Sequence, residues 1–96
     1  MNEFFENDIT LVNQLLEAQV LEYQCGRYQM WCQKGYFKEN YIHFMQEFQE
    51  KKEMIQAVFQ KKYGKVISYE ELQHAFKEYQ KSMEDNLQRK THMGLN

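Results

Sequence analysis

The stretch "LVNQLLEAQVLEYQCGRYQMWCQKGY", residues 11–36, decides the expected fold because it carries two apolar stripes at helical spacing. The first stripe advances in steps of three and four residues and comprises Leu11, Leu15, Ala18, Leu21, Cys25, Tyr28 and Cys32. The second lies nearly opposite when each residue is advanced by ~100°, and it comprises Val12, Leu16, Val20, Tyr23 and Met30. A helix on the outside of a bundle needs only one stripe. We therefore expect this helix to be buried on two sides, by its own neighbours or by a second chain.

Local signals predict that this first helix extends over about residues 8–33. Asp8 or Asn7 can cap its start, because a short polar side chain accepts a hydrogen bond from the free N–H groups of a first turn. Gly35 follows Lys34 as a stop, and the basic residue stands where the helix dipole favours positive charge.

A second helix is expected over about residues 37–63, with Gly64 as its C-terminal stop. Its stripe is a near-heptad seam of large residues that is interrupted by Lys51 or Lys52 and comprises Phe37, Tyr41, Phe44, Phe48, Ile55, Val58 and Phe59. Such side chains suit small partners such as Ala18 and Cys25, because large residues must face small ones to fill a core.

The third helix has the clearest start, because residues 68–71, Ser-Tyr-Glu-Glu, form a capping box. Ile67 and Leu72 are placed around it as a hydrophobic staple. The apolar stripe that follows comprises Leu72, Ala75, Phe76, Tyr79, Met83 and Leu87. We expect the helix to end near Lys90, at about residues 69–90, and residues 91–96 to form a loose tail.

The chain as a whole predicts one all-α domain over residues 1–96. It contains no proline and only four glycines in 96 residues, which favours long helices with short connections. Short connections place consecutive helices antiparallel to each other. The expected fold is therefore an antiparallel up-down-up three-helix bundle.

Composition and charge exclude several classes of function. The net charge of −2 provides no field that would select nucleic acid or an anionic membrane. Uninterrupted apolar runs are two or three residues long, which excludes a membrane span. The acidic start "MNEFFENDIT" does not have the pattern of a signal peptide, and two cysteines without an export signal indicate a reducing, cytoplasmic setting.

The residues that could carry chemistry fit structural roles better. Cys25 and Cys32 share a helix face about 10 Å apart, beyond the reach of a disulfide, and continue the first apolar stripe. Glu71 and His74 match the Glu-x-x-His unit of di-iron bundles, but both point away from the apolar stripe and no second unit is present. We expect no catalytic residue, no metal site and no cofactor, and hence no enzyme.

The second stripe of the first helix is the strongest functional signal. Arg27 and Trp31 are four residues apart and can stack as a cation–π pair beside Tyr23 and Met30. These residue types are enriched where proteins bind one another. Contact with a partner and packing against the third helix remain two open interpretations. The predicted partner-binding residues are Val12, Leu16, Val20, Tyr23, Arg27, Met30 and Trp31.

The sequence thus predicts a small non-enzymatic interaction module, such as a regulator, inhibitor or adaptor/chaperone, that binds another protein and self-associates as a homodimer. The alternative is a small nucleic-acid-binding regulator that uses the basic helix ends. These ends comprise Lys61, Lys62 and Lys65 on one helix and Arg89 and Lys90 on the next. In antiparallel neighbours the two C-termini lie at opposite poles, which counts against a shared footprint.

Overall fold

The computed structural model describes the backbone of residues 2–94 and the side chains of residues 4–88. The described residues form four helices and no strand: α1 (Asn2–Asn7), α2 (Ile9–Gln33), α3 (Lys38–Tyr63) and α4 (Tyr69–Gly94). The prediction of an all-α helical bundle is confirmed, and the starts of α2, α3 and α4 lie within a residue of those expected. α4 extends to Gly94, beyond the end expected near Lys90, and the loose tail stays a prediction for residues 95–96, which lie outside the described residues.

Both ends of α2 follow local chemistry. Asp8 is the N-cap, and its Oδ1 accepts a hydrogen bond of 3.0 Å from the Leu11 N–H. At the other end, Gly35 has a φ of 90°, a left-handed conformation that costs a residue without a Cβ little. The helix therefore begins and ends where polar and glycine signals place it.

The start of α3 corrects one expectation. Phe37 was expected within the helical stripe, but it precedes Lys38 as a left-handed N-cap with a φ of 58°. A non-glycine residue adopts this conformation only when its surroundings hold it there. The Phe37 ring contacts the rings of Tyr28 and Trp31 at centroid distances of 5.9 and 5.4 Å, which supplies that support.

The start of α4 shows the serine cap of the predicted capping box. The Ser68 Oγ accepts a hydrogen bond of 3.1 Å from the Glu71 N–H, as the motif predicts. Ile67 packs against the core that contains Leu72, in agreement with the expected staple. At the preceding helix end, Gly64 has a φ of 67° and donates its N–H to the Gln60 carbonyl at 2.8 Å.

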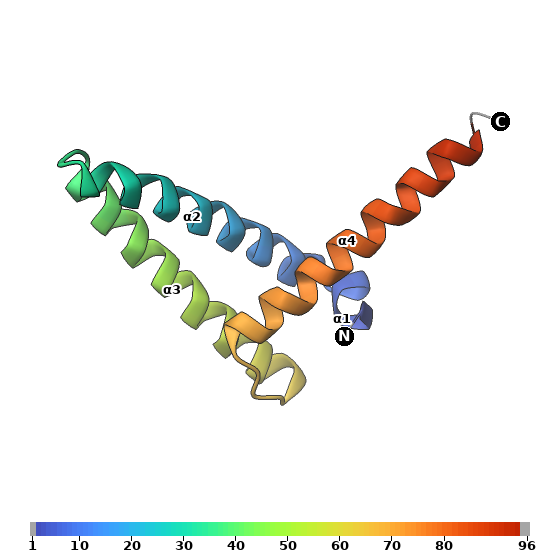
Figure 1. The fold of residues 1–96 in the computed structure, drawn as a ribbon. Coiled ribbons are helices and arrows are strands. Elements are labelled where there is room, and N and C mark those ends of the chain that lie inside the picture. Colours follow the sequence, from blue (N-terminus) through green and yellow to red (C-terminus); the bar gives the residue numbers. More distant parts are fainter. Residues whose placement is uncertain (1, 95–96) are drawn as a thin grey trace.

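The helices are arranged as a hairpin crossed by a third rod (Figure 1). α2 and α3 run antiparallel, whereas α4 starts beside the end of α3, crosses α2 and extends away from the hairpin. The full up-down-up arrangement is therefore not confirmed. Part of the apolar side of α4 packs against α1 instead of along the hairpin, because the Phe5 ring lies 5.3 Å from the rings of both Phe76 and Tyr79.

The hydrophobic core lies at the crossing rather than along the whole hairpin. It joins all four helices and consists of Phe5, Leu11, Leu15, Ala18, Ile55, Phe59, Tyr69, Leu72 and Phe76. Away from it, the hairpin is held by aromatic contacts such as the stacked rings of Tyr28 and Phe44, 5.1 Å apart. The six-residue helix α1 was not expected from the sequence, although Phe4 and Phe5 both pack there.

The molecule is flat and extended. Its principal extents are 53, 39 and 17 Å, so it is about three times as long as it is thick. The radius of gyration is 16.7 Å, whereas a compact domain of 96 residues is expected at about 12.5 Å. Such a shape leaves long helix faces without a covering layer.

None of the helices in the described residues combines the length and the apolar character that crossing a membrane requires.

Candidate protein-binding face

The second stripe of α2 lies on the surface. Four of its five predicted apolar members are exposed, Leu16 39%, Val20 59%, Tyr23 64% and Met30 63%, and Ile9, which is 71% exposed, lies on the same face. Together with Arg27, which is also exposed, these residues define what we term the α2 face. The expectation that the helix is buried on two sides by its own neighbours is wrong for the described chain. Only the first stripe is covered, because α4 crosses α2 instead of lying along it.

Two residues predicted for the same face are placed differently. Val12 is half-buried and packs against the core at the crossing. Trp31 is half-buried at the hairpin tip, where its ring lies 5.1 Å from Tyr28 and 5.4 Å from Phe37. Both therefore contribute to packing within the chain, and the accessible part of the predicted set is Leu16, Val20, Tyr23, Arg27 and Met30.

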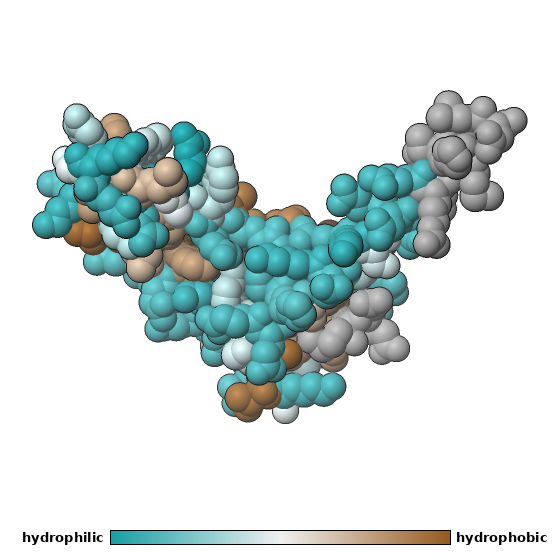
Figure 2. All heavy atoms as spheres, viewed as in Figure 1, coloured by the Kyte–Doolittle hydropathy of each residue, from teal (hydrophilic) through white to brown (hydrophobic). Residues whose placement is uncertain are grey.

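The predicted cation–π pair is present at the hairpin tip. The Arg27 guanidinium carbon lies 5.0 Å from the Trp31 ring centroid and 5.8 Å from the Tyr23 ring centroid. Stacking between two rings restricts the long side chain of Arg27, so less freedom is lost if a partner contacts it. Figure 2 shows brown and tan hydrophobic residues gathered around this tip, on a surface that is otherwise mostly hydrophilic.

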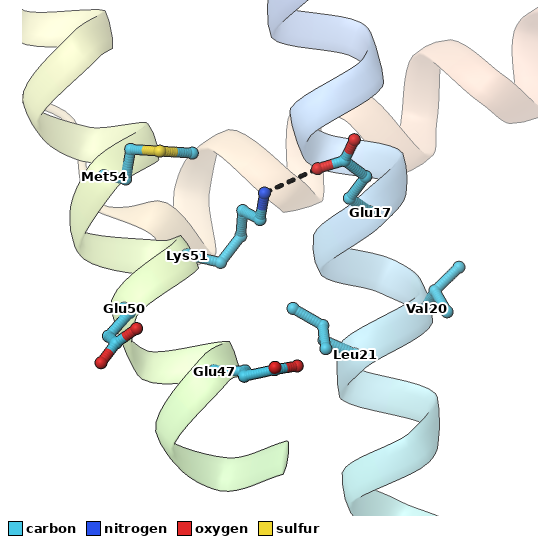
Figure 3. A pocket seen from close by; sticks show the side chains of 7 residues that line it. All are labelled: Glu17, Val20, Leu21, Glu47, Glu50, Lys51 and Met54. Carbon is cyan, nitrogen blue, oxygen red and sulfur yellow. Dashed lines mark hydrogen bonds and ion pairs between the residues drawn. The ribbon is translucent and has the colours of Figure 1, made fainter. Parts of the chain in front are cut away.

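A groove between α2 and α3 borders the α2 face (Figure 3). It has a volume of about 590 Å³ and is lined by Glu17, Val20, Leu21, Glu47, Glu50, Lys51 and Met54. Lys51 reaches across from α3 and forms an ion pair of 2.6 Å with Glu17 on α2, whereas Val20 points away from α3. Carboxylates and methyl groups alternate along the groove. It therefore does not offer one uniform chemistry to a small ligand.

A second groove lies in the angle between α2 and α4 and was not predicted. It has a volume of about 320 Å³ and is lined by Val12, Leu16, Phe76, Tyr79, Gln80, Met83, Glu84 and Leu87. Met83 and Leu87 were expected to extend the buried stripe of α4, which is wrong: they are 46% and 62% exposed. The reason is again the crossing angle, because the second half of α4 extends away from the hairpin.

The crossing itself is held by side-chain amides. Gln19 on α2 donates from Nε2 to the Oε1 atoms of Gln73 and Gln80, at 2.7 and 2.8 Å. Gln73 is buried and donates to the Leu15 carbonyl at 3.3 Å and to the Tyr69 hydroxyl at 2.9 Å. Buried amides with satisfied hydrogen bonds define one relative position of two helices better than methyl groups do. The angle between α2 and α4 is thus a specific feature of this chain.

The buried Asp8 carboxylate joins α2 to the end of α3. In addition to Leu11, it accepts hydrogen bonds from Lys62 Nζ at 2.8 Å and from the Tyr63 hydroxyl at 2.7 Å. Burial alone would raise the pKa of Asp8, but the hydrogen bonds from Lys62, Tyr63 and Leu11 outweigh it, and the pKa lies below the ordinary value of 3.8. The cluster is a structural link between two helices.

The same cluster bears on the nucleic-acid alternative. Lys62 is paired with Asp8, and the Lys65 ammonium lies over the Phe4 ring at 5.2 Å. The C-terminal ends of α3 and α4 point to different parts of the molecule (Figure 1). The geometry therefore provides no specific observation in favour of a basic footprint shared by the two helix ends.

Cys25, Cys32 and His43 occupy positions typical of structural residues. Cys25 is buried and Cys32 half-buried, and both are free thiols. Burial, with the nearby charge of Glu22, raises the pKa of the Cys25 thiol and so favours its unreactive form. His43 pairs with Glu47 at 3.0 Å on the surface of α3. Among the described residues, no group of three or more His, Cys, Asp or Glu side chains is placed to hold a metal ion.

The sequence analysis did not predict that Ile9 belongs to the α2 face or that the outer half of α4 is exposed. Ile9 is the first residue of α2, and its position on the second stripe follows from the same helical spacing as that of Leu16. The exposure of Met83 and Leu87 depends on the crossing angle and has no local signal in the sequence.

Comparison of the chain with known protein families, with curated proteins and with solved structures finds no match.

Proposed function

We propose that this protein is a non-enzymatic interaction module that binds another protein through the α2 face. The observation that carries the proposal is the row of exposed apolar and aromatic side chains on one helix, flanked by a stacked arginine. Large exposed apolar patches on a folded protein mark sites of association. Tyr, Met and Arg are also the types enriched at interfaces, and α2 presents all three.

The strength of such contacts can be bounded. Burying one side chain such as Val20, Tyr23 or Met30 contributes about 1.5–3 kcal/mol. Association costs about 4–15 kcal/mol in lost translational and rotational freedom. Three such side chains therefore give at most weak binding by themselves. We expect a stable complex to cover additional surface next to the α2 face.

The role we propose is that of a regulator, inhibitor or adaptor that acts by occupying a partner, and self-association as a homodimer is part of the proposal. The extended shape supports it, because the hairpin has no further helix of the described residues packed along the α2 face. The free thiols of Cys25 and Cys32 fit a reducing compartment such as the cytoplasm, which is the setting we propose.

The experiment that tests the α2 face compares two Val→Glu variants. Val20→Glu places a charge in the α2 face, and Val66→Glu makes the same change at a residue that is 86% exposed in the connection before α4. Sedimentation equilibrium over a wide concentration range measures self-association, and circular dichroism measures helicity.

We expect Val20→Glu to weaken self-association at least tenfold with unchanged helicity, because a carboxylate would have to lose its water in the interface. Val66→Glu should associate like the unmodified protein. A protein that stays monomeric throughout, or equal association of the two variants, would contradict the proposal.

A further inference from the structure

We propose that the hairpin tip binds a short acidic segment of another protein, in which carboxylates lie next to apolar side chains. The hairpin tip comprises residues 23–44, which form the end of α2, the turn and the first part of α3 (Figure 1). This inference rests on the proposed function in that it names the chemistry of the partner. It depends on Lys34, Phe37 and Lys38, which lie outside the α2 face and can be tested separately.

The hairpin tip has a charge opposite to that of the rest of the molecule. It contains three cations, Arg27, Lys34 and Lys38, and one carboxylate, Glu39, which give it a charge of +2 with His43 neutral. The chain as a whole carries −2, so the residues outside the tip carry −4. Opposite charges on two surfaces favour and orient their association. A negatively charged segment therefore fits the tip.

The three cations of the tip are not neutralised within the chain. Lys34 and Lys38 are exposed, and among the described residues neither they nor Arg27 take part in an ion pair. At the other end of α3, by contrast, Lys62 pairs with Asp8. The Arg27 guanidinium stacks on the Trp31 ring, and the edge of a stacked guanidinium still carries N–H groups that bind carboxylates in pairs. All three positive charges can thus bind a partner's carboxylates.

The identity of residue 37 is the second observation that indicates binding. Phe37 is 53% exposed and has a left-handed backbone with a φ of 58°. Glycine or asparagine adopts this conformation at a lower cost, and turns exposed to water favour such residues. Contact with Tyr28 and Trp31 covers only part of the phenyl ring. Strained residues of this kind are typical of sites that bind, and Phe37 is the apolar contact we assign to the partner.

The exposed rings of the tip are held in place before a partner arrives. The turn is closed by a hydrogen bond of 2.9 Å from the Tyr36 N–H to the Trp31 carbonyl. The Tyr36 residue is 63% exposed, and its ring lies 6.5 Å from that of Phe37. A preformed surface loses little freedom on binding. The turn therefore presents two exposed rings between Lys34 and Lys38, which fits a segment with apolar and acidic side chains next to each other.

A short acidic segment fits the tip better than an extended polyanion does. Segments that recognise anionic lipids carry about four to eight basic residues, whereas the tip carries three. Single-stranded nucleic acid is bound along a positively charged groove. The groove between α2 and α3 is instead lined by Glu17, Glu47 and Glu50, which would repel phosphates (Figure 3). A partner that places its carboxylates at the tip alone avoids this repulsion.

Selection from a random peptide library tests the chemistry of the partner. The immobilised full chain is screened against phage that display short random peptides, and the selection is repeated with the Lys34→Glu/Lys38→Glu variant. We expect the unmodified protein to enrich peptides in which Asp or Glu neighbours an aliphatic or aromatic residue, and the variant to lose this enrichment. Enrichment of basic or uncharged peptides, or no enrichment at all, would overturn the proposal.

A matched pair of variants tests whether the charges act at the tip. Lys34→Glu/Lys38→Glu and Lys77→Glu/Lys81→Glu make the same change at two exposed lysines four residues apart, at the tip and on α4. Fluorescence polarisation measures the affinity for the most enriched peptide, and circular dichroism measures helicity. We expect the tip variant to lose affinity by about tenfold or more, because attraction becomes repulsion, and the α4 variant to bind like the unmodified protein. Equal losses would show that only the net charge matters and refute the site.

Phe37→Asn tests whether the phenyl ring binds the partner or only packs within the tip. Asparagine tolerates a left-handed backbone, so the turn is retained while the ring is removed. We expect the affinity for the same peptide to fall about tenfold with helicity unchanged, because exposed aromatic anchors contribute strongly to binding. Unchanged affinity together with a lower thermal midpoint would give Phe37 a structural role alone and contradict the proposal.

Two other anionic partners are outcomes of the same series. Vesicles of equal parts phosphatidylcholine and phosphatidylserine test a lipid surface, and oligothymidylate tests single-stranded nucleic acid. Neither should bind in a way that depends on Lys34 and Lys38. Binding to either one that Lys34→Glu/Lys38→Glu abolishes would assign the tip to a different class of partner and overturn the proposal.

The outcomes separate this inference from the proposed function. Self-association that Val20→Glu weakens, combined with no selection of acidic peptides, would retain the α2 face and refute binding at the tip. Tip-dependent binding of acidic peptides by a chain that stays monomeric would support the tip and count against the α2 face as a site of self-association.

Discussion

At the residue scale, a few polar and glycine positions determine where the helices begin, end and meet. Asp8 combines two functions, because one of its oxygens caps α2 and the other bonds to Lys62 and Tyr63 at the end of α3. Gly64 adopts a left-handed conformation, whereas Gly26 lies inside α2 with open space around the position of a Cβ. The interactions of Asp8 and the contrast between the two glycines lead to two predictions.

Replacing Asp8 should change the stability of the protein in acid. Because the pKa of Asp8 is lower in the folded chain than its ordinary value of 3.8, its contribution is present above that value and is lost as the pH falls through the folded pKa. We expect Asp8→Ala to lower the free energy of unfolding by about 2 kcal/mol at pH 7. The difference from the unmodified protein should shrink as the pH approaches 2, as measured by urea unfolding monitored by circular dichroism.

The control for Asp8 is Glu6→Gln, at an exposed carboxylate two residues earlier. It should leave both the free energy of unfolding and its pH dependence within experimental error of the unmodified protein. An effect of Asp8→Ala that is the same at pH 7 and pH 2 would show that the ionised carboxylate is not what stabilises the link.

Two Gly→Ala variants should act in opposite directions. Gly26→Ala is expected to raise the free energy of unfolding by about 0.5–1 kcal/mol, because a helical backbone gains from alanine and nothing obstructs the added methyl group. Gly64→Ala should lower it by about 1 kcal/mol, because its φ of 67° strains a residue with a Cβ. Thermal unfolding of the two variants side by side measures the difference, and equal shifts would refute this assignment.

At the scale of the elements, the shortest helix has the largest influence on the arrangement. α1 places the Phe5 ring against Phe76 and Tyr79 of α4, and the Phe4 ring against Phe59 and Tyr63 of α3, with centroid distances of 4.5–5.5 Å. It therefore fills the angle between two helices that do not run alongside each other. Without it, the first half of α4 would lose part of its apolar cover.

Phe5→Ala should consequently destabilise the whole bundle. Phe5 is 3% exposed, and removing a buried phenylalanine side chain costs about 3–5 kcal/mol in lost burial and residual cavity. Ile9→Ala, four residues later and 71% exposed, should change the free energy of unfolding by less than about 0.5 kcal/mol. Denaturant unfolding measures both values. Similar values for the two variants would mean that α1 is not part of the cooperative core.

At the scale of the whole molecule, the fold is a helical hairpin crossed by α4. The core lies at the crossing of the helices, and the hairpin tip and the outer half of α4 extend from it in different directions (Figure 1). Stability in such a molecule is uneven, because segments with few buried contacts open with little free energy. The outer half of α4 is one of these segments in a single copy.

Hydrogen exchange should therefore differ between the core and the outer half of α4. We expect the amides of residues 80–88 to exchange faster than the amides around Leu15, Ile55 and Leu72, because these three residues belong to the core. Equal protection of the two regions, measured by mass spectrometry, would contradict this expectation.

Local sequence signals suffice for the helical class and for the starts of α2, α3 and α4 to within one residue, because caps, glycines and the spacing of apolar residues act within a few residues of chain. The end of α4 lies at Gly94 instead of near Lys90. The sequence by itself also indicated the second stripe of α2, since helical periodicity places those residues on one face. Only the tertiary structure decided which faces are covered. The angle at which α4 crosses α2 depends on α1 and on hydrogen bonds between Gln19, Gln73 and Gln80, which are distant in sequence. Because no local pattern encodes that angle, the exposure of Met83 and Leu87 and the groove beside them could be seen only in the folded molecule.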